Sequence, residues 1–336
     1  MKVINKDNVS PTEPRRSRAS AAVAFCADEG FSLPLAVALA SLGRVARASR
    51  DHFTVYIVDG GLRPETRARL DRLGSRFGSN VSVVWLRPKP SRLDGLIGMA
   101  HLPVATYLRL LLPELLPANL DRVVYVDCDV LIRTSLAALY EIPLGEKLLL
   151  AVPDMLFDDL PHRLRVGPAA SATSGIRYVN AGLLVFDPRR WRAERVVDRV
   201  LAFLRMHPDR LEWADQDGIN AVLWSEIGLL NSAWNVQYGL SVLQRSARRV
   251  SLFDLGQIPS SHACHILHFT GSSKPWIIGA LDAERLTYAV ALFRSRWMPC
   301  YSIAWLIIRS LIEHLRTWRR GRFGPIRHSK SATVAG

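Results

Sequence analysis

The chain has 336 residues, of which 49% are hydrophobic and 22% charged, a globular balance that excludes disorder as the main state. The formal net charge is +14, and most of it lies at the two ends. Residues 294–336 carry nine Lys or Arg against one Glu, and residues 1–20 carry five against two acids. The stretch between them is almost neutral, which argues against a nucleic-acid-binding body.

The four cysteines are Cys26, Cys128, Cys264 and Cys300, and none forms a C-x-x-C pair. Three of them lie in apolar runs typical of core strands, so we expect free thiols in a reducing cytosol. The chain is polar through Ser20, without the apolar core of a signal peptide, and no segment reaches the roughly 18 apolar residues of a membrane span. These features predict a protein that faces the cytoplasm.

The first half of the chain alternates between strand and helix patterns. After a flexible basic arm, residues 1–20, buried strands are expected at Ala21–Ala27, Phe53–Val58 and Val81–Leu86. A helical pattern runs from Leu33 to about Ala48, and Pro64 suits the first position of a second helix. This order predicts a mostly parallel sheet with crossover helices.

The second half continues the α/β pattern and then changes character. Further strands are expected at Arg122–Val126, Leu148–Val152, Tyr178–Phe186 and Cys264–Phe269, with helices over Pro188–Met206 and Ala214–Trp224. We expect one catalytic α/β domain over residues 21–292, followed by a basic amphipathic tail over 293–336.

The sharpest motif is Asp127-Cys128-Asp129, directly after an apolar strand pattern. In an extended chain residues i and i+2 point to the same side, so both carboxylates would lie together at the carboxyl edge of the sheet, where α/β folds bind ligands. A metal ion would relieve their repulsion. A simple turn also explains such a pair. Haloacid-dehalogenase-like phosphatases share the spacing, but there it occupies the first strand and continues to Thr.

His268 ends the last predicted strand and is followed by Gly271 and Lys274. An imidazole can complete a carboxylate site for Mn²⁺, glycine lets a backbone approach a diphosphate, and lysine supplies a positive charge. A histidine at a strand end can equally be structural. The spacing of Cys264 and His265 matches no zinc pattern.

Two weaker signals come from polar residues in other predicted elements. Asn180 stands at the mouth of the apolar strand pattern YVNAGLLVFD, and Asp215-Gln216-Asp217 begins a helix. Each has a structural explanation, either local backbone hydrogen bonding or helix capping by acids.

Taken in order, five motifs over about residues 21 to 280 resemble glycosyltransferase family 8, which includes lipopolysaccharide galactosyl- and glucosyltransferases and glycogenin. They are AFCADEGF, TYLRLLLPELLP before YVDCDVLI, YVNAGLLVFDPRRW, ADQDGIN and HFTGSSKPW. The resemblance implies a GT-A fold, which binds nucleotide sugars, and a retaining transferase. Its donor would be UDP-glucose or UDP-galactose, and its acceptor a glycan or glycolipid of the cell envelope.

The resemblance also implies roles for individual residues. Asp127, Asp129 and His268 would bind Mn²⁺ or Mg²⁺. Ala27, Asp28 and Phe31, the last where many relatives have Tyr, would line the uridine pocket, and Gly271 and Lys274 would hold the phosphates. The residues around the donor hexose would be Arg109, Asn180, Ala181, Asp215 and Gln216. From the loops that follow the Leu148–Val152 strand, Asp154 is a candidate contact for the acceptor.

The tail pattern from Tyr301 to Arg320 predicts an amphipathic helix. Ala304, Ile308, Leu311, Leu315 and Trp318 recur on one face, with basic residues opposite and beyond. Such a helix suits the interface of an anionic membrane, and we expect a peripheral location on the inner face of the cytoplasmic membrane. A helix packed on the catalytic domain would show the same pattern. The alternative function is a nucleotide-sugar-binding protein without transferase activity; no nucleic-acid partner is expected.

Overall fold

The computed structural model describes residues 20–96, 104–157, 159–165, 175–238, 264–271, 274–277 and 283–323. The chain divides into two compact units, Met1–Ser272 and Ser273–Gly336. The predicted basic arm lies outside the described residues apart from Ser20, and the expected domain boundary at 292/293 stays a prediction.

A seven-stranded sheet forms the centre of the first unit, in the order β3-β2-β1-β4-β7-β6-β8. Every neighbouring pair is parallel except those that involve β7, which runs antiparallel to β4 and β6. The inner strands are buried along nearly their whole length, which explains their unbroken apolar runs. The strands are β1 (Ala21–Ala27), β2 (Phe53–Asp59), β3 (Val81–Leu86), β4 (Val123–Val126), β6 (Leu149–Pro153), β7 (Val179–Phe186) and β8 (Ile227–Leu229).

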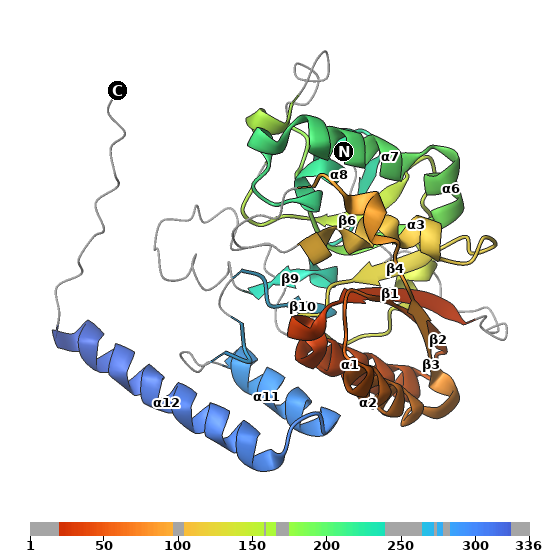
Figure 1. Cartoon of the computed structure of the whole chain (residues 1–336). Coiled ribbons are helices and arrows are strands. Elements are labelled where there is room, and N and C mark those ends of the chain that lie inside the picture. Colours follow the sequence, from red (N-terminus) through yellow and green to blue (C-terminus); the bar gives the residue numbers. More distant parts are fainter. Residues whose placement is uncertain are drawn as a thin grey trace, which may run out of the picture. The chain divides into compact units, whose positions relative to one another are not determined.

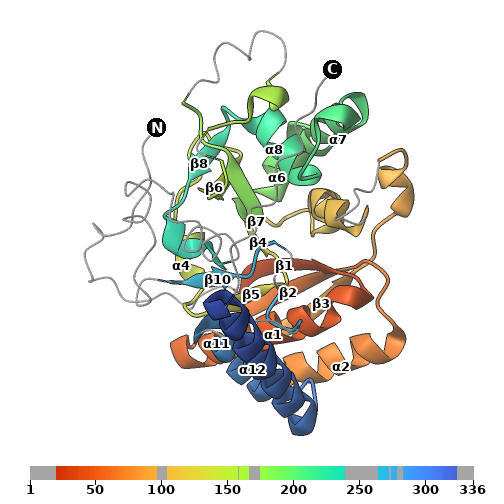
Figure 2. The same cartoon turned by 90° about the vertical axis from the view of Figure 1, so that its left-hand side faces the viewer.

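Helices lie on both sides of this sheet. In both views α1 and α2 lie on one side, and α6, α7 and α8 gather on the other (Figures 1 and 2). The helices of this unit are α1 (Ser32–Ser49), α2 (Pro64–Ser75), α3 (Leu112–Leu115), α4 (Ala137–Tyr140), α6 (Pro188–Ala193), α7 (Val196–Met206) and α8 (Asp215–Leu223). Short 3-10 turns join them: η1 (Glu29–Phe31), η2 (Gly78–Asn80), η3 (Pro90–Leu93), η4 (Val104–Leu111), η5 (His162–Leu164), η6 (Pro208–Arg210) and η7 (Ser232–Trp234).

A second, three-stranded sheet brings distant parts of the chain together. Its order is β5 (Val130–Ile132), β10 (Ile266–His268) and β9 (Val236–Gln237). Strand β10 is antiparallel to β5, with His268 opposite Val130, and parallel to β9, with His268 opposite Gln237. The end of the first unit therefore lies beside the segment that directly follows β4.

The predicted α/β class, with a mostly parallel sheet and flanking helices, is confirmed. The expected helix over Pro188–Met206 is instead two helices, because Arg195 has a left-handed φ of 51° that ends one and starts the other. Strands β5, β8 and β9 were not predicted; each has only two or three residues, too few for a periodic pattern. The cysteines of the described residues are free thiols, as predicted.

We expected no segment with the length and apolar composition of a membrane span, but one helical segment has both. Among the described residues, the helical segment Glu29–Ser49 is long and apolar enough to cross a membrane, and 61% of its most apolar window is buried. Leu35, Leu39 and Leu42 of α1 are fully enclosed in the first unit. A core helix passes the same test of length and composition, so this feature alone is weak support for a membrane segment.

The described residues of the second unit form two helices, α11 (Ala283–Ser295) and α12 (Cys300–Phe323). Helix α12 confirms the predicted tail helix. Ile303 and Ser310 are buried, whereas the face predicted to be apolar is exposed at Ala304, Ile308, Leu311 and Leu315. Tyr301, Trp305 and Ile312 add to this exposed apolar surface. The side chain of Trp318 lies outside the described residues.

Candidate active site

Asp127 and Asp129 lie in the bend between β4 and β5. The Asp127 N–H donates to the Gly182 carbonyl at 2.9 Å, which continues the β4–β7 pairing. The intervening Cys128 is buried, and its thiol contacts the Cys26 carbonyl at 3.2 Å. Because Cys128 points into the core, its two neighbours project the other way, as expected for residues i and i+2.

His268 completes the group that these carboxylates begin. Its Nε2 lies 3.2 Å from Asp129 Oδ1 and 3.8 Å from Asp127 Oδ2, and one ligand atom from each residue lies within 4.8 Å of the others. Phe269 N–H donates to the Asp129 carbonyl at 2.9 Å, so the β5–β10 pairing continues to the site itself. Two carboxylates and an imidazole suit Mn²⁺ or Mg²⁺ with positions left for oxygen ligands.

Gly182 on β7 lets the His268 ring approach this closely. A Cβ added at position 182 would lie 2.2 Å from His268 Cε1, far inside contact distance. The ring therefore fills a space that only glycine leaves open. This packing fixes the imidazole beside the carboxylates and supports the fit of a cation to the three residues.

Arg109 joins the metal-ligand group to a second buried carboxylate. Its Nη1 lies 3.0 Å from Asp127 Oδ1 and its Nε 2.7 Å from Asp215 Oδ2. The Tyr125 hydroxyl donates to the same Asp127 Oδ1, and the Arg109 guanidinium lies over the Tyr125 ring. Asp127 thus uses one oxygen for these protein contacts and presents the other, Oδ2, to His268.

Asp215 is 1% exposed and lies at the start of α8. Burial raises its pKa to about 7, although the nearby Arg109 lowers it; the Asp127 charge raises it further. Apart from the Arg109 ion pair, neither carboxyl oxygen has a hydrogen-bond partner among the described residues. Oxygens of this kind suit the hydroxyl groups of a ligand.

The turn before Asp215 is held in a strained backbone conformation. Ala214 is buried with φ 50° and ψ −122°, a region that residues with a Cβ rarely adopt. Asp217 stabilises this turn, because its Oδ2 accepts the N–H groups of Glu212 and Trp213 at 2.6 and 2.8 Å. Its Oδ1 accepts the Tyr178 hydroxyl at 2.6 Å. These contacts fix the orientation of Asp215 and Gln216 in the site.

Half-buried Gln216 and the buried Asn180 and Asp154 form a polar cluster next to Asp215. The Gln216 carbonyl oxygen accepts Ala181 N–H at 2.9 Å, and its NH₂ group donates to Asp154 Oδ2 at 3.1 Å. Asn180 also donates to Asp154 Oδ2, at 3.0 Å. The structure thus brings together all the residues predicted around the donor hexose. Asp154 is buried and binds this cluster; its predicted acceptor contact stays a prediction.

The residues predicted to bind the nucleotide lie at several places. Ala27 ends β1, Asp28 accepts Phe31 N–H at 3.1 Å, and Phe31 is 36% exposed. Gly271, with φ 73°, ends the described part of the first unit. Lys274 belongs to the second unit, where its ammonium lies 5.9 Å from the Trp276 ring, and its phosphate contact stays a prediction.

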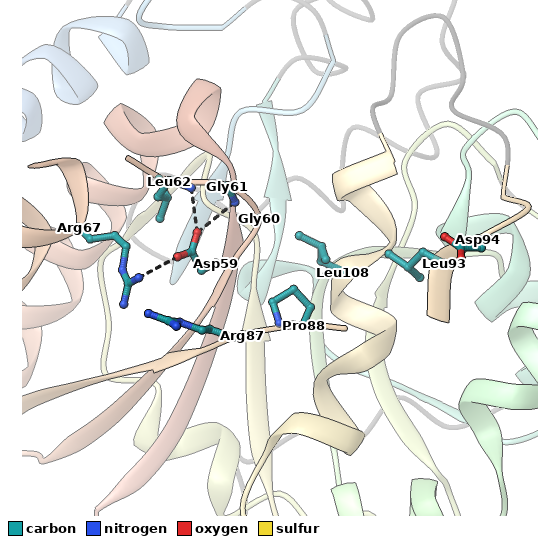
Figure 3. Close-up of a pocket in the computed structure, with 10 residues that line it drawn as sticks. All are labelled: Asp59, Gly60, Gly61, Leu62, Arg67, Arg87, Pro88, Leu93, Asp94 and Leu108. Atoms are coloured by element: carbon teal, nitrogen blue, oxygen red, sulfur yellow. Dashed lines mark hydrogen bonds and ion pairs between the residues drawn. The ribbon is translucent and has the colours of Figure 1, made fainter. Parts of the chain in front are cut away.

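A cavity of about 630 Å³, not predicted from the sequence, lies beyond the carboxyl ends of β2 and β3. Figure 3 shows Asp59 on one wall, where it pairs with Arg67 at 3.2 Å, and Leu108 opposite. None of the predicted site residues lines it. Two backbone neighbours connect it to the site: Gly60 N–H donates to the Ala27 carbonyl, and Leu108 precedes Arg109. The other lining residues are Gly61, Leu62, Arg87, Pro88, Leu93 and Asp94.

Three further residues of the site, Tyr125, Gly182 and Asn235, were not predicted from the sequence. Tyr125 and Gly182 sit inside apolar strands, where nothing marks them as different from core residues. Asn235 directly precedes β9, a strand too short to predict, so its hydrogen bond to His268 could not be predicted either.

The family model "Glycosyl transferase family 8" matches residues 22–278. The chain is 25% identical to general stress protein A of Bacillus subtilis over 82% of this chain and 94% of the relative. It is 24% identical to lipopolysaccharide 1,3-galactosyltransferase of Salmonella typhimurium, over 83% and 79%. The crystal structure of the galactosyltransferase LgtC with donor and acceptor sugar analogues has a TM-score of 0.69 at 21% identity, over 83% and 98%, and shares the fold.

Replacing Asp215 by Asn is expected to change how stability depends on pH. Since its folded pKa is about 7 and an unfolded aspartate titrates near 4, the folded protein keeps a proton that the unfolded chain releases. Wild-type stability should therefore fall as pH rises from about 4 to 7, by up to about 4 kcal/mol from this group. Asp215→Asn should remove this loss, as measured by urea unfolding of the metal-free protein at pH 5 and pH 8.

Asp198→Asn is the matched control. Hydrogen bonds from Arg92 and Arg195 lower the pKa of the Asp198 carboxyl, so its removal should not alter the change in unfolding free energy between pH 5 and 8. If wild type and Asp215→Asn lost the same stability between these two pH values, the raised pKa of Asp215 would be wrong.

Proposed function

The chain belongs to glycosyl transferase family 8, and we propose that it moves glucose or galactose from a UDP-hexose to a glycan acceptor of the cell envelope. The observation that carries this proposal is the arrangement of Asp127, Asp129 and His268 beside the polar cluster of Asp215, Gln216 and Asn180. The named activity of the Salmonella typhimurium relative supports a lipopolysaccharide or related exopolysaccharide as the acceptor.

Asp127, Asp129 and His268 would hold Mn²⁺, or Mg²⁺ in its place. Bound there, the cation would neutralise the negative charge that develops on the departing diphosphate. Gly271 and Lys274 would hold the phosphates, and Ala27, Asp28, Phe31 and Ala181 would contact the nucleotide. The close packing of His268 on Gly182 supports this assignment, because it holds one ligand rigidly before any ion arrives.

The donor hexose would lie against Arg109, Asn180, Asp215 and Gln216. Positive charge develops on the sugar ring as its C1–O bond breaks, and the oxygens of Asp215, Gln216 and Asn180 would stabilise it. Arg109 holds Asp215 and Asp127 in place from one side. Asp154 holds Gln216 and Asn180 from the other side, and we propose it as a contact for the acceptor.

Retention of the anomeric configuration would follow from attack on the same face of the sugar. A double displacement needs a carboxylate near C1. The residue that matches the family position is Gln216, an amide and a poor nucleophile, whose two ends are already engaged by Ala181 and Asp154. We propose that the departing phosphate oxygen takes the proton of the acceptor hydroxyl while that hydroxyl attacks C1.

The second unit would attach the enzyme to the inner face of the cytoplasmic membrane. Support comes from the exposed apolar residues of α12, among them Tyr301, Trp305 and Ile308, together with the basic charge of residues 294–336. An interfacial helix combines these two properties, and anionic lipids attract each basic residue by about 1 kcal/mol.

Hydrolysis of UDP-sugars without acceptor tests the metal assignment. Wild-type protein is expected to release UDP from UDP-glucose or UDP-galactose with Mn²⁺, to stop with EDTA and to recover when Mn²⁺ is restored. Asp129→Asn should lower the rate at least about 100-fold, because a ligand charge is lost, while the circular dichroism spectrum stays unchanged. A folded Asp129→Asn variant with wild-type turnover would contradict the metal site. Binding of UDP-sugar with no turnover on any acceptor would favour a nucleotide-sugar-binding protein.

Stereochemistry tests the retaining mechanism. The first product formed from an α-linked UDP-hexose is expected to be α-linked, as read by proton NMR. Gln216→Ala should slow transfer without abolishing it, since no covalent bond to this residue is required. A β-linked product would refute retention, and complete loss of transfer in a folded Gln216→Ala variant would argue that the residue forms an intermediate.

Vesicle sedimentation tests the membrane assignment. The intact protein should bind vesicles that contain phosphatidylglycerol and release them as salt rises, because exposed charges are screened over about 8 Å at physiological ionic strength. Ile308→Ser with Leu311→Ser should weaken binding, and so should Gln at Arg316, Arg319, Arg320 and Arg322. Met206→Ser, at an exposed apolar position of α7, is the matched control and should have no effect. Equal binding by all variants would show that α12 does not contact lipid.

A further inference from the structure

Asn235 connects the candidate metal ligand His268 to the polar cluster of Asn180, Asp154 and Gln216, which is called the donor-hexose cluster below. It is buried, and its Oδ1 lies 2.9 Å from His268 Nδ1. Its Nδ2 donates to Asn180 Oδ1 at 2.8 Å. Asn180 in turn donates to Asp154. The chain of hydrogen bonds therefore runs from the imidazole to the carboxylate that holds Gln216.

The direction of these hydrogen bonds is fixed at both ends. Gly182 N–H, which can only donate, donates to Asn180 Oδ1 at 2.9 Å, so the carbonyl side of the Asn180 amide faces Gly182 and Asn235. The Asp154 carboxylate accepts from the opposite side of that amide. Asn235 must then turn its NH₂ group toward Asn180 and its carbonyl oxygen toward His268.

A carbonyl oxygen only accepts, so His268 must carry its proton on Nδ1. In the neutral imidazole the lone pair of Nε2 then lies on the side of Asp127 and Asp129, where a cation could accept it; Nε2 lies 3.2 Å from Asp129 Oδ1. Histidines that ligate metals commonly donate their second N–H in this way, and loss of the partner typically costs 10- to 100-fold in metal affinity or activity.

The local fold holds Asn235 rigidly enough for this role. Its N–H donates to the Ser232 carbonyl at 3.1 Å at the end of η7, and Asn231 caps the same turn through Ala233 N–H. The next residue, Val236, starts β9, which pairs with β10 beside His268. The backbone on both sides of Asn235 is therefore fixed relative to the imidazole.

We propose that Asn235 is a positioning residue that selects the metal-binding tautomer of His268 and couples it to the donor-hexose cluster. This inference rests on the proposed function only for the identity of the cation and the sugar. Asn235 itself would touch neither.

Two substitutions of the full-length protein separate the two halves of this role. Asn235→Ala removes both hydrogen bonds, and Mn²⁺ binding, measured by calorimetry with the metal alone, should weaken 10- to 100-fold. Asn235→Asp keeps an acceptor for His268 but turns a second acceptor toward Asn180. It should keep Mn²⁺ affinity within about threefold of wild type, while the KM for UDP-hexose hydrolysis rises about 10-fold or more.

Asn231→Ala is the matched control from the same turn. It removes the cap of η7 without touching His268, so it should lower stability and leave Mn²⁺ affinity unchanged. Wild-type Mn²⁺ affinity in a folded Asn235→Ala variant would overturn the proposal. So would a 10-fold loss of affinity in Asn235→Asp, which serves as the deciding variant if Asn235→Ala does not fold.

A measurement without metal separates this proposal from the proposed function. In the ¹H–¹⁵N spectrum of the metal-free protein, His268 should show the Nδ1–H tautomer in wild type and Asn235→Asp, and a different tautomer distribution in Asn235→Ala. If wild type bound no Mn²⁺ but showed this pattern, the positioning role would stand and the metal assignment would fall. An Nε2–H tautomer in wild type would refute the positioning role.

Discussion

The two ion pairs of Arg109 are the interaction on which the site depends. Asp127 follows β4 and Asp215 begins α8, and two carboxyl groups so close would repel each other when both are ionised without a cation between them. The guanidinium is planar with several donors, so it can bind both carboxylates and the Ala181 carbonyl at 2.8 Å at once. Lysine, with a compact ammonium, could not span the same three acceptors.

The polar cluster around Asn180 is ordered by the pairing of hydrogen-bond donors with acceptors rather than by charge. Asn180 lies at its centre, with Gly182, Asn235 and Asp154 as partners. A buried amide with all its groups paired has one orientation, because a flip would set donor against donor. The group of Asp127, Asp129 and His268 and the cluster around Gln216 are thus parts of one hydrogen-bonded network, and a shift in one disturbs the other.

Much of this architecture could be predicted, because its signals are local. Apolar runs of strand length, such as Ala21–Ala27 and Val81–Leu86, predict buried strands. The placement of Asp127 and Asp129 follows from their spacing after such a strand. The grouping of His268 with them was implied only by resemblance. Its physical cause is the pairing of β5 with β10, a contact between distant segments that no local pattern contains.

Other features escaped prediction for the same kind of reason. The strained backbone at Ala214 is held by hydrogen bonds from Glu212 and Trp213 N–H to the Asp217 carboxylate, and an alanine carries no sign of an unusual φ. Asn235 is one of many asparagines in the chain until β9 sets it beside β10. The break at Arg195 shows that helical periodicity on both sides of a residue does not ensure helix through it.

The β5–β10 pairing also has a consequence for the order in which the protein is made. The two carboxylates leave the ribosome about 140 residues before the imidazole that joins them, and β10 is the last strand of the first unit. Until then β5 lacks its neighbour, and closing so long a loop carries an entropy cost that local contacts do not share. The group of Asp127, Asp129 and His268 can therefore assemble only when synthesis of this unit is nearly complete. A nascent chain that stops earlier has two of these three residues and an open strand edge.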